Sequence, residues 1–164
     1  MNFLESSLSD LYQSAVEAFP KTQMRQHATH DIVITNLHWM PFVGMKTLFI
    51  RGLANQNEGR EYSPIILIKK VHFLEKGGRV IKTDGQNYFL EQISFNNDVL
   101  LRCNCADFSF RFNFYDYTDK SLYGRKRKKY ESKGGPPANP MKMPGMCKHL
   151  LKLIEVLKND GIFQ

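Results

Sequence analysis

The placement of the three cysteines restricts the folding of this chain more than any other feature of its sequence. Cys103 and Cys105 form one pair around a single asparagine, and Cys147 forms a second pair with His149 around a single lysine. Three thiolates and one imidazole make a complete tetrahedral ligand set for zinc, and no cysteine is left over. The sequence therefore predicts a structural Zn²⁺ site that ties the two pairs together.

Each pair lies at the end of a predicted element. Cys103 and Cys105 lie at the end of the predicted strand DVLLRCNC, and side chains two apart on a strand point to the same side. Residues 147–158 carry a leucine-rich stripe at helical spacing, so Cys147 lies at the N-terminus of a helix, where the helix dipole stabilises a thiolate. A closed four-ligand site has no open position for water or substrate, which indicates a structural role.

Two alternatives to zinc remain open from these residues. Cysteine is often buried as a small apolar side chain, so three free thiols and a surface histidine need no metal. A catalytic cysteine–histidine pair is the other alternative, but a nucleophilic cysteine also needs a third, orienting group, and the sequence suggests none.

The rest of the chain predicts an α+β fold in a single domain, residues 1–164. Residues 3–18 have the spacing of an amphipathic helix, which Pro20 ends. Short β-rich runs then alternate with turn signals, among them the Asp84-Gly85 step that favours a hairpin. We expect a mainly antiparallel sheet or small barrel, with the N-terminal helix and a C-terminal helix tied to the sheet by zinc.

The run FSFRFNFY, residues 108–115, alternates phenylalanines with other side chains. A period of two is typical of a half-buried strand, so Phe108, Phe110, Phe112 and Phe114 are predicted to face the core. The alternative is a platform on which nucleic-acid bases stack, but such platforms place aromatic and basic side chains together on one exposed face. On a strand, the polar side chains of this run would lie on the opposite side.

Residues 116–146 form a long Pro/Gly-rich insertion with a basic run inside it. The net charge of the chain is +7, and five of its cations are Arg125, Lys126, Arg127, Lys128 and Lys129, so the rest is nearly balanced. A loop of this length inside a domain usually has a function. The basic run is predicted to bind nucleic acid or an acidic protein partner, with a solvated loop tip as the alternative.

Other features argue against an enzyme and against a membrane protein. His27, His30 and Asp31 are close in sequence, but the default interpretation is surface polar residues, and no glycine-rich phosphate-binding motif is present. No small-molecule substrate is expected. The first ten residues do not have the pattern of a signal peptide, and no apolar run is long enough to span a bilayer. The odd number of cysteines favours metal binding in a reducing cytoplasm, where the chain is synthesised.

The two ligand pairs, CNC at 103–105 and CKH at 147–149, resemble the SWIM-type zinc finger, whose pattern is C-x-C, a variable insertion and C-x-H. The resemblance covers about residues 98–158 and implies zinc binding by the same four residues. It also implies binding to DNA or protein. The wider phrase CNCADFSFRF…PPANPMKMPGMCKHL is similar to small structural virion proteins of tailed bacteriophages, which implies a location in the virion and no residue-level function.

Two functions follow as expectations. The first is a non-enzymatic assembly protein, stabilised by zinc, that docks onto other protein subunits in a larger structure such as a phage particle. The second is a nucleic-acid-binding module that uses residues 125–129 to contact phosphates.

Overall fold

A computed structural model describes residues 6–18, 31–55 and 60–163, and these residues form the predicted α+β fold. Helix α1 (Leu8–Ala18) lies near the N-terminus and helix α4 (Lys148–Asn159) near the C-terminus. Leu8, Leu11 and Ala15 are buried on α1, as the helical spacing predicted. Leu4 and Pro20, which belonged to the same prediction, lie outside the described residues.

The main sheet has five antiparallel strands. Its order is β1-β2-β4-β8, and a short fifth strand, β3, pairs with the end of β2. The bounds are β1 (Val33–Phe42), β2 (Thr47–Asn55), β3 (Glu61–Tyr62), β4 (Ile65–Ile68) and β8 (Val99–Arg102). The sequence predicts either an antiparallel sheet or a small barrel. Since the described strands make an open path rather than a closed ring, the structure has the sheet.

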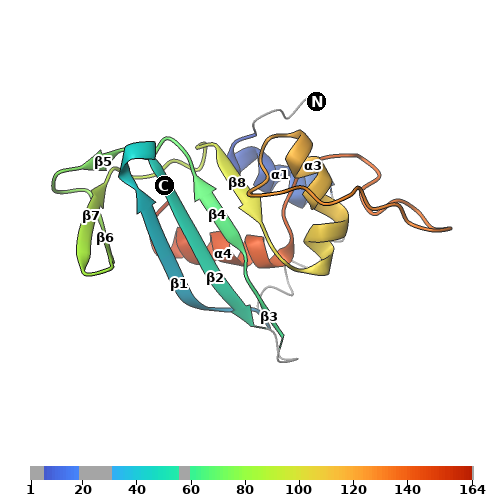
Figure 1. Ribbon diagram of the computed structural model, residues 1–164, viewed down its shortest axis with the longest axis horizontal. Coiled ribbons are helices and arrows are strands. Elements are labelled where there is room, and N and C mark those ends of the chain that lie inside the picture. The colour runs from blue at the N-terminus through green and yellow to red at the C-terminus, as the bar shows by residue number, and fades with distance from the viewer. Residues whose placement is uncertain (1–5, 19–30, 56–59, 164) are drawn as a thin grey trace.

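A second, smaller antiparallel sheet projects from one end of the molecule (Figure 1). It contains β5 (Phe73–Leu74), β6 (Arg79–Thr83) and β7 (Gln86–Leu90) in the order β5-β7-β6. Asp84 and Gly85 join β6 to β7 with positive φ angles of 52° and 73°, as a two-residue turn of type I′ requires. The predicted hairpin at this Asp-Gly step is confirmed.

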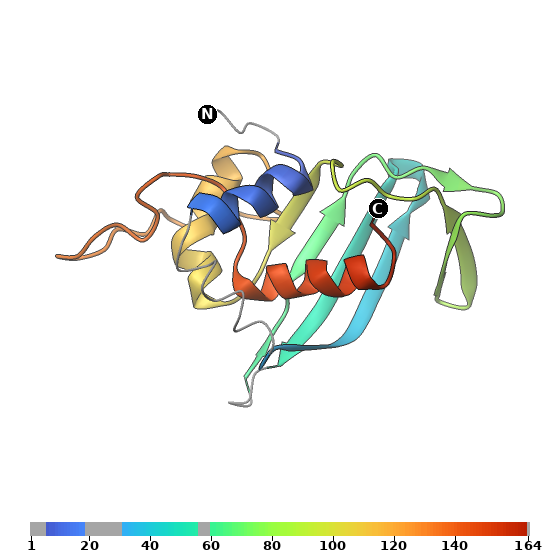
Figure 2. The ribbon, with the colours of Figure 1, turned by 180° about the vertical axis from the view of Figure 1, so that it is seen from behind.

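One face of the main sheet is covered by helices. Figure 2 shows α4 lying across this face, with α1 beside it. The buried side chains of the strands alternate with partly exposed ones, and those facing α4 are Leu48, Ile50, Ala54, Ile66, Ile68, Val99 and Leu101. All of them except Ala54 belong to one buried cluster with the apolar stripe of α4, which consists of Leu150, Leu153, Ile154 and Leu157. The C-terminal helix predicted at residues 147–158 is therefore confirmed, and its first residue is Lys148.

The strand predicted for residues 108–115 is wrong, because residues 106–118 are helical. A π-helical turn, η3 (Phe108–Phe112), continues directly into α3 (Asn113–Thr118). Phe108 and Phe112, four residues apart, are buried on one side, whereas Phe110 is 48% exposed. The Asp107 and Arg111 side chains pair at the same helical spacing, with 2.9 Å between oxygen and nitrogen.

The insertion predicted for residues 116–146 begins later than expected, because α3 includes its first three residues. The remainder is irregular but anchored to the helices. Asn139 is buried, and its side-chain amide donates hydrogen bonds to the backbone oxygens of Arg111 (2.9 Å) and Met143 (2.7 Å). The Ser14 hydroxyl donates to the Pro144 oxygen (2.7 Å), so α1 also holds the end of the insertion. These contacts place residues 144–147 against the helices rather than in solvent.

Candidate metal centre

The structure brings Cys103, Cys105, Cys147 and His149 together in one buried cluster. Their three Sγ atoms and the histidine nitrogen all lie within 4.8 Å of one another. The Nδ1 atom of His149 is 3.9 Å from Sγ of Cys103 and 4.0 Å from Sγ of Cys147. A tetrahedral zinc site separates its sulfur and nitrogen ligands by about 3.6–3.8 Å, so a small contraction brings these donors to bonding positions. The donor set therefore fits a metal ion.

Two helix N-termini meet at this cluster. Cys147 is the N-cap residue of α4, and its backbone oxygen accepts a hydrogen bond from the Leu151 N–H (3.0 Å). Cys105 directly precedes the helical segment 106–118, and its Sγ accepts a hydrogen bond from the Phe108 N–H (3.3 Å). The partial positive charge of both helix ends favours thiolates. The alternating pattern of residues 108–115 predicts a strand, so the sequence does not indicate this second helix N-terminus.

Strand β8 ends at Arg102, so Cys103 and Cys105 are not on the strand as predicted. They occupy the turn that leads from the sheet into the helical segment 106–118. The two sulfurs still face a common point, because this turn and the N-terminus of the helix bring them there. The predicted proximity is confirmed, whereas the predicted cause, strand alternation, is wrong.

The pKa values of the three thiols are shifted in different directions. Burial raises the pKa of Cys147 well above its ordinary value. The hydrogen bond between the Cys103 and Cys105 thiols raises the pKa of Cys103 and lowers the pKa of Cys105. The cluster alone therefore favours a single thiolate that accepts hydrogen bonds from neighbouring thiols. A bound dication would reverse this balance, because metal coordination deprotonates thiols.

His149 faces the sulfurs with Nδ1, and its other nitrogen points away from them. Nε2 is buried and has no hydrogen-bond partner among the described residues. The imidazole ring instead packs on the Tyr62 ring of β3, with 4.5 Å between ring centroids and 34° between planes. This contact fixes the orientation of the ring and indicates Nδ1 as the ligand atom. Nothing in the sequence pattern pointed to Tyr62.

The segment that leads into Cys147 is held by Asp116 and Phe112. Oδ1 of Asp116 accepts a hydrogen bond from the Gly145 N–H (2.8 Å), and the Phe112 ring packs directly against Gly145. Asp116 is fully buried, and its Oδ2 has no partner among the described residues. Burial therefore raises the pKa of Asp116 well above its usual range.

We expect the folded protein to lose stability relative to an Asp116→Asn variant as pH rises. A carboxyl group whose pKa is raised by folding binds more protons in the folded state, so stability falls above the pKa of the unfolded chain. Urea unfolding at several pH values between about 5 and 8 measures the free energy of unfolding of both proteins and therefore the difference between them. Protons that are linked to metal binding contribute equally to both proteins, so they cancel in this difference.

The matched control for this comparison is Glu91→Gln, which removes an exposed carboxylate. Its difference from the parent protein should stay flat over the same pH range. A flat difference for Asp116→Asn as well would mean that the buried carboxyl ionises as readily in the folded chain as in the unfolded one.

The basic run lies outside the metal cluster, along the helical segment 106–118. All five of its residues are exposed, and the backbone N–H of Arg127 donates to the Asn113 side chain (2.7 Å). The ammonium of Lys126 lies 4.9 Å from the Tyr117 ring centroid, and that of Lys129 lies 5.7 Å from the Phe114 centroid. Because this segment is helical, aromatic and basic side chains share one surface, contrary to the strand interpretation.

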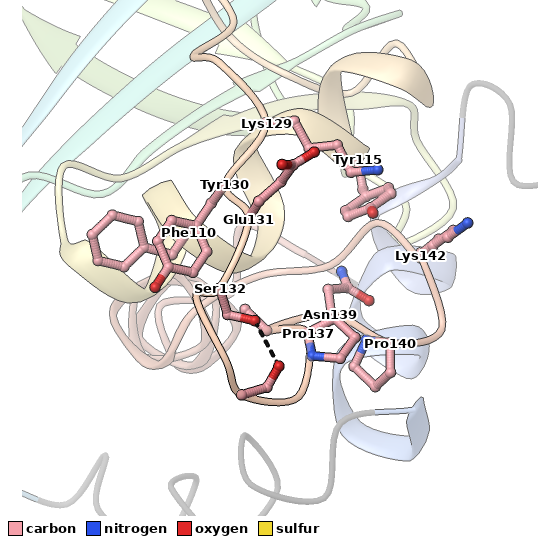
Figure 3. A pocket seen from close by; sticks show the side chains of 12 residues that line it. Phe110, Tyr115, Lys129, Tyr130, Glu131, Ser132, Pro137, Asn139, Pro140 and Lys142 are labelled. Atoms are coloured by element: carbon pink, nitrogen blue, oxygen red, sulfur yellow. Dashed lines mark hydrogen bonds between the residues drawn. The ribbon is translucent and has the colours of Figure 1, made fainter.

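The insertion folds around a cavity of about 310 Å³ next to this surface. Figure 3 shows the stacked rings of Phe110 and Tyr130 at one side of the cavity, and the prolines 137 and 140 opposite them. The two ring centroids are 4.6 Å apart. Ser132 closes a turn by donating to the Gly135 and Pro136 oxygens. The insertion thus makes contacts within itself, while it projects from the body of the molecule (Figure 1) and its residues 133–137 are exposed.

The remaining predicted polar group lies mostly outside the part of the chain that the structure describes. His27 and His30 lie outside the described residues, and Asp31 is exposed. No helix in the described parts of the chain is both long and apolar enough to cross a membrane. Comparison with protein-family models, curated proteins and solved structures finds no match for this chain.

Proposed function

We propose that this chain is a non-enzymatic assembly protein whose fold is stabilised by one structural zinc ion. The observation that carries the proposal is the buried Cys₃His cluster, whose four donor atoms lie within 4.8 Å of one another. A mainly thiolate, tetrahedral set favours zinc over hard cations such as Mg²⁺ and Ca²⁺. All four ligands come from the protein, which leaves no coordination position for a substrate.

The site would fix the main sheet and helix α4 relative to each other, as an assembly protein requires. The ligands come from the turn after β8 and from the N-terminus of α4, and residues 106–146 form a closed loop between them. Zinc offsets the entropy lost by closing such a loop. The resemblance to SWIM-type zinc fingers and to tailed-phage virion proteins is in keeping with a zinc-stabilised domain that docks onto other subunits.

A second candidate function is nucleic-acid binding by residues 125–129. The specific observation in its favour is the shared surface of cations and aromatic rings, in which Tyr117 is 47% exposed beside Lys126 and Phe110 is 48% exposed. Single-stranded nucleic acid binds such surfaces by stacking of bases and neutralisation of phosphates. Five adjacent cations would make this binding independent of sequence and strongly dependent on salt.

One experiment tests both functions. Native mass spectrometry of the wild type and of a variant with glutamine at positions 125–129 reports the metal content and oligomeric state of each. Fluorescence anisotropy with an oligothymidylate reports DNA binding at about 50 mM and about 200 mM salt. An assembly protein should hold one zinc ion per chain in both the wild type and the variant, and the two should have the same oligomeric state. Its DNA binding should be weak and should vanish at the higher salt.

The other outcomes are also distinct. Folded protein without metal would refute the zinc site. DNA binding that persists at the higher salt in the wild type and is abolished in the variant, with the zinc retained, would favour the nucleic-acid function instead.

A further inference from the structure

No helix covers the face of the main sheet that points away from α4 in the described part of the chain, but the Tyr123 ring packs on this face, with 5.5 Å between its centroid and that of the Phe49 ring. Figure 1 shows this outer face toward the viewer, with β1, β2, β4 and β8 side by side and α4 behind them. A sheet with one solvated face normally carries polar side chains there. Strand β4 instead reads Ile65-Ile66-Leu67-Ile68, which is apolar on both faces, as in strands that are covered on both sides.

The register of the strands aligns an apolar row across the outer face. Met40 lies opposite Phe49, Phe49 opposite Leu67, and Leu67 opposite Leu100. Met40 is 38% exposed, and the other three side chains are partly exposed. Four neighbouring strands span roughly 14 Å, which a helix covers in about ten residues. The row therefore has the dimensions of a helix-packing surface.

A basic row runs beside the apolar row. His38 lies opposite Arg51, Arg51 opposite Ile65, and Ile65 opposite Arg102, so neither row contains a carboxylate. The Arg102 guanidinium donates hydrogen bonds to the backbone oxygens of Tyr123 (3.0 Å) and Arg125 (2.8 Å). The positive charge of this row thus continues into the basic run at the edge of the sheet.

The positive charges of the basic row favour an acidic partner over a second copy of this chain. A second copy of this chain on the same face would bring arginine rows together, in a protein whose net charge is already +7. An acidic partner would neutralise the row, and an apolar stripe on that partner would cover Met40, Phe49, Leu67 and Leu100. A helix is the element that commonly completes a layer on a sheet.

We propose that the outer face of the five-stranded sheet is a docking surface for an acidic amphipathic helix of another protein. This proposal rests on the proposed assembly function and specifies the surface and the partner chemistry for it. The helix would lay its leucine-type stripe along the apolar row and direct carboxylates toward Arg51 and Arg102.

The test uses the full chain, loaded with zinc and labelled with ¹⁵N, and a designed helical peptide of about 18 residues that carries a leucine stripe flanked by glutamates. A control peptide has lysine at every glutamate position. The acidic peptide should shift the amide signals of β1, β2, β4 and β8, and Arg51→Glu should weaken its binding about tenfold. Lys76→Glu makes the same change of charge at an exposed position in the turn before β6 and should alter binding less than about twofold.

A second variant tests the apolar contact. Met40→Ser, at the exposed edge strand, should weaken the acidic peptide several-fold without affecting the fold. The proposal would be overturned by equal binding of the two peptides, or by shifts confined to residues 125–142. It would also be overturned by a dimer of the chain that buries the same face, or by an oligothymidylate that produces the same shifts.

Native mass spectrometry before the titration separates this proposal from the zinc site. A chain that holds zinc and does not bind the peptide refutes only the docking surface. A metal-free chain that binds the acidic peptide as described refutes the zinc site and supports the docking surface.

Discussion

The Cys147→Ser protein is expected to lose its zinc and to be destabilised by more than about 5 kcal/mol. Binding of a structural zinc ion contributes directly to folding free energy, and a serine hydroxyl does not replace a thiolate ligand. The ends of β8 and α4 would then be joined only by side-chain packing.

Three measurements check this expectation together. Native mass spectrometry gives the zinc content, thermal unfolding followed by circular dichroism gives the loss of stability, and amide hydrogen exchange locates it. Exchange should increase most within residues 98–158. A strong chelator should lower the melting temperature of the wild type toward that of the variant, and should change the variant little.

Met146→Leu is the matched control, because Met146 is buried and adjacent to Cys147 but contributes no ligand. A swap of similar volume should cost less than about 1.5 kcal/mol and leave the zinc content unchanged. If Cys147→Ser kept both the melting temperature and the metal content of the wild type, the cluster would not be a metal site.

Replacement of Gly145 by alanine should produce the second large effect. A Cβ at position 145 would lie 2.6 Å from Cε1 and 3.1 Å from Cδ1 of Phe112. Phe112 is completely buried, so its ring has no free space into which to move. We expect a loss of about 1–3 kcal/mol from overpacking, together with weaker zinc binding because Gly145 leads directly into Cys147.

Gly135→Ala is the control for this substitution. Gly135 lies in the same insertion, and a Cβ there would meet nothing within 4 Å. Urea unfolding and competition for zinc with a chromogenic chelator measure both effects for both variants. Equal behaviour of the two alanine variants would show that the close approach of Gly145 to Phe112 does not constrain the ligand segment.

The error at residues 108–115 has a clear physical origin. Phe108 and Phe112 are separated by four residues, so the same sequence satisfies a period of two and the i, i+4 spacing of a helix. The Asp107–Arg111 pair and the capping sulfur of Cys105 favour the helix. These contacts have individually small energies, and only the packing of Phe108 and Phe112 against the rest of the core decides between the two periods.

The ligand set shows what local sequence specified. Cys103, Cys105, Cys147 and His149 were identified by residue type and spacing, since few groups of side chains satisfy a tetrahedral soft-metal site. The leucine stripe of α4 and the Asp84-Gly85 hairpin turn were equally evident. Each depends on interactions between residues that are near in sequence or on the chemistry of the side chains themselves.

Tertiary structure alone decided how the site is built and which surface remains open. The choice of Nδ1 depends on the contact between His149 and Tyr62, and the position of Cys147 depends on Asp116 and Phe112. The two rows of the outer face exist only because β1, β2, β4 and β8 pair in one register. These arrangements join residues far apart in the chain, and their energies arise from packing and burial that local periodicity does not encode.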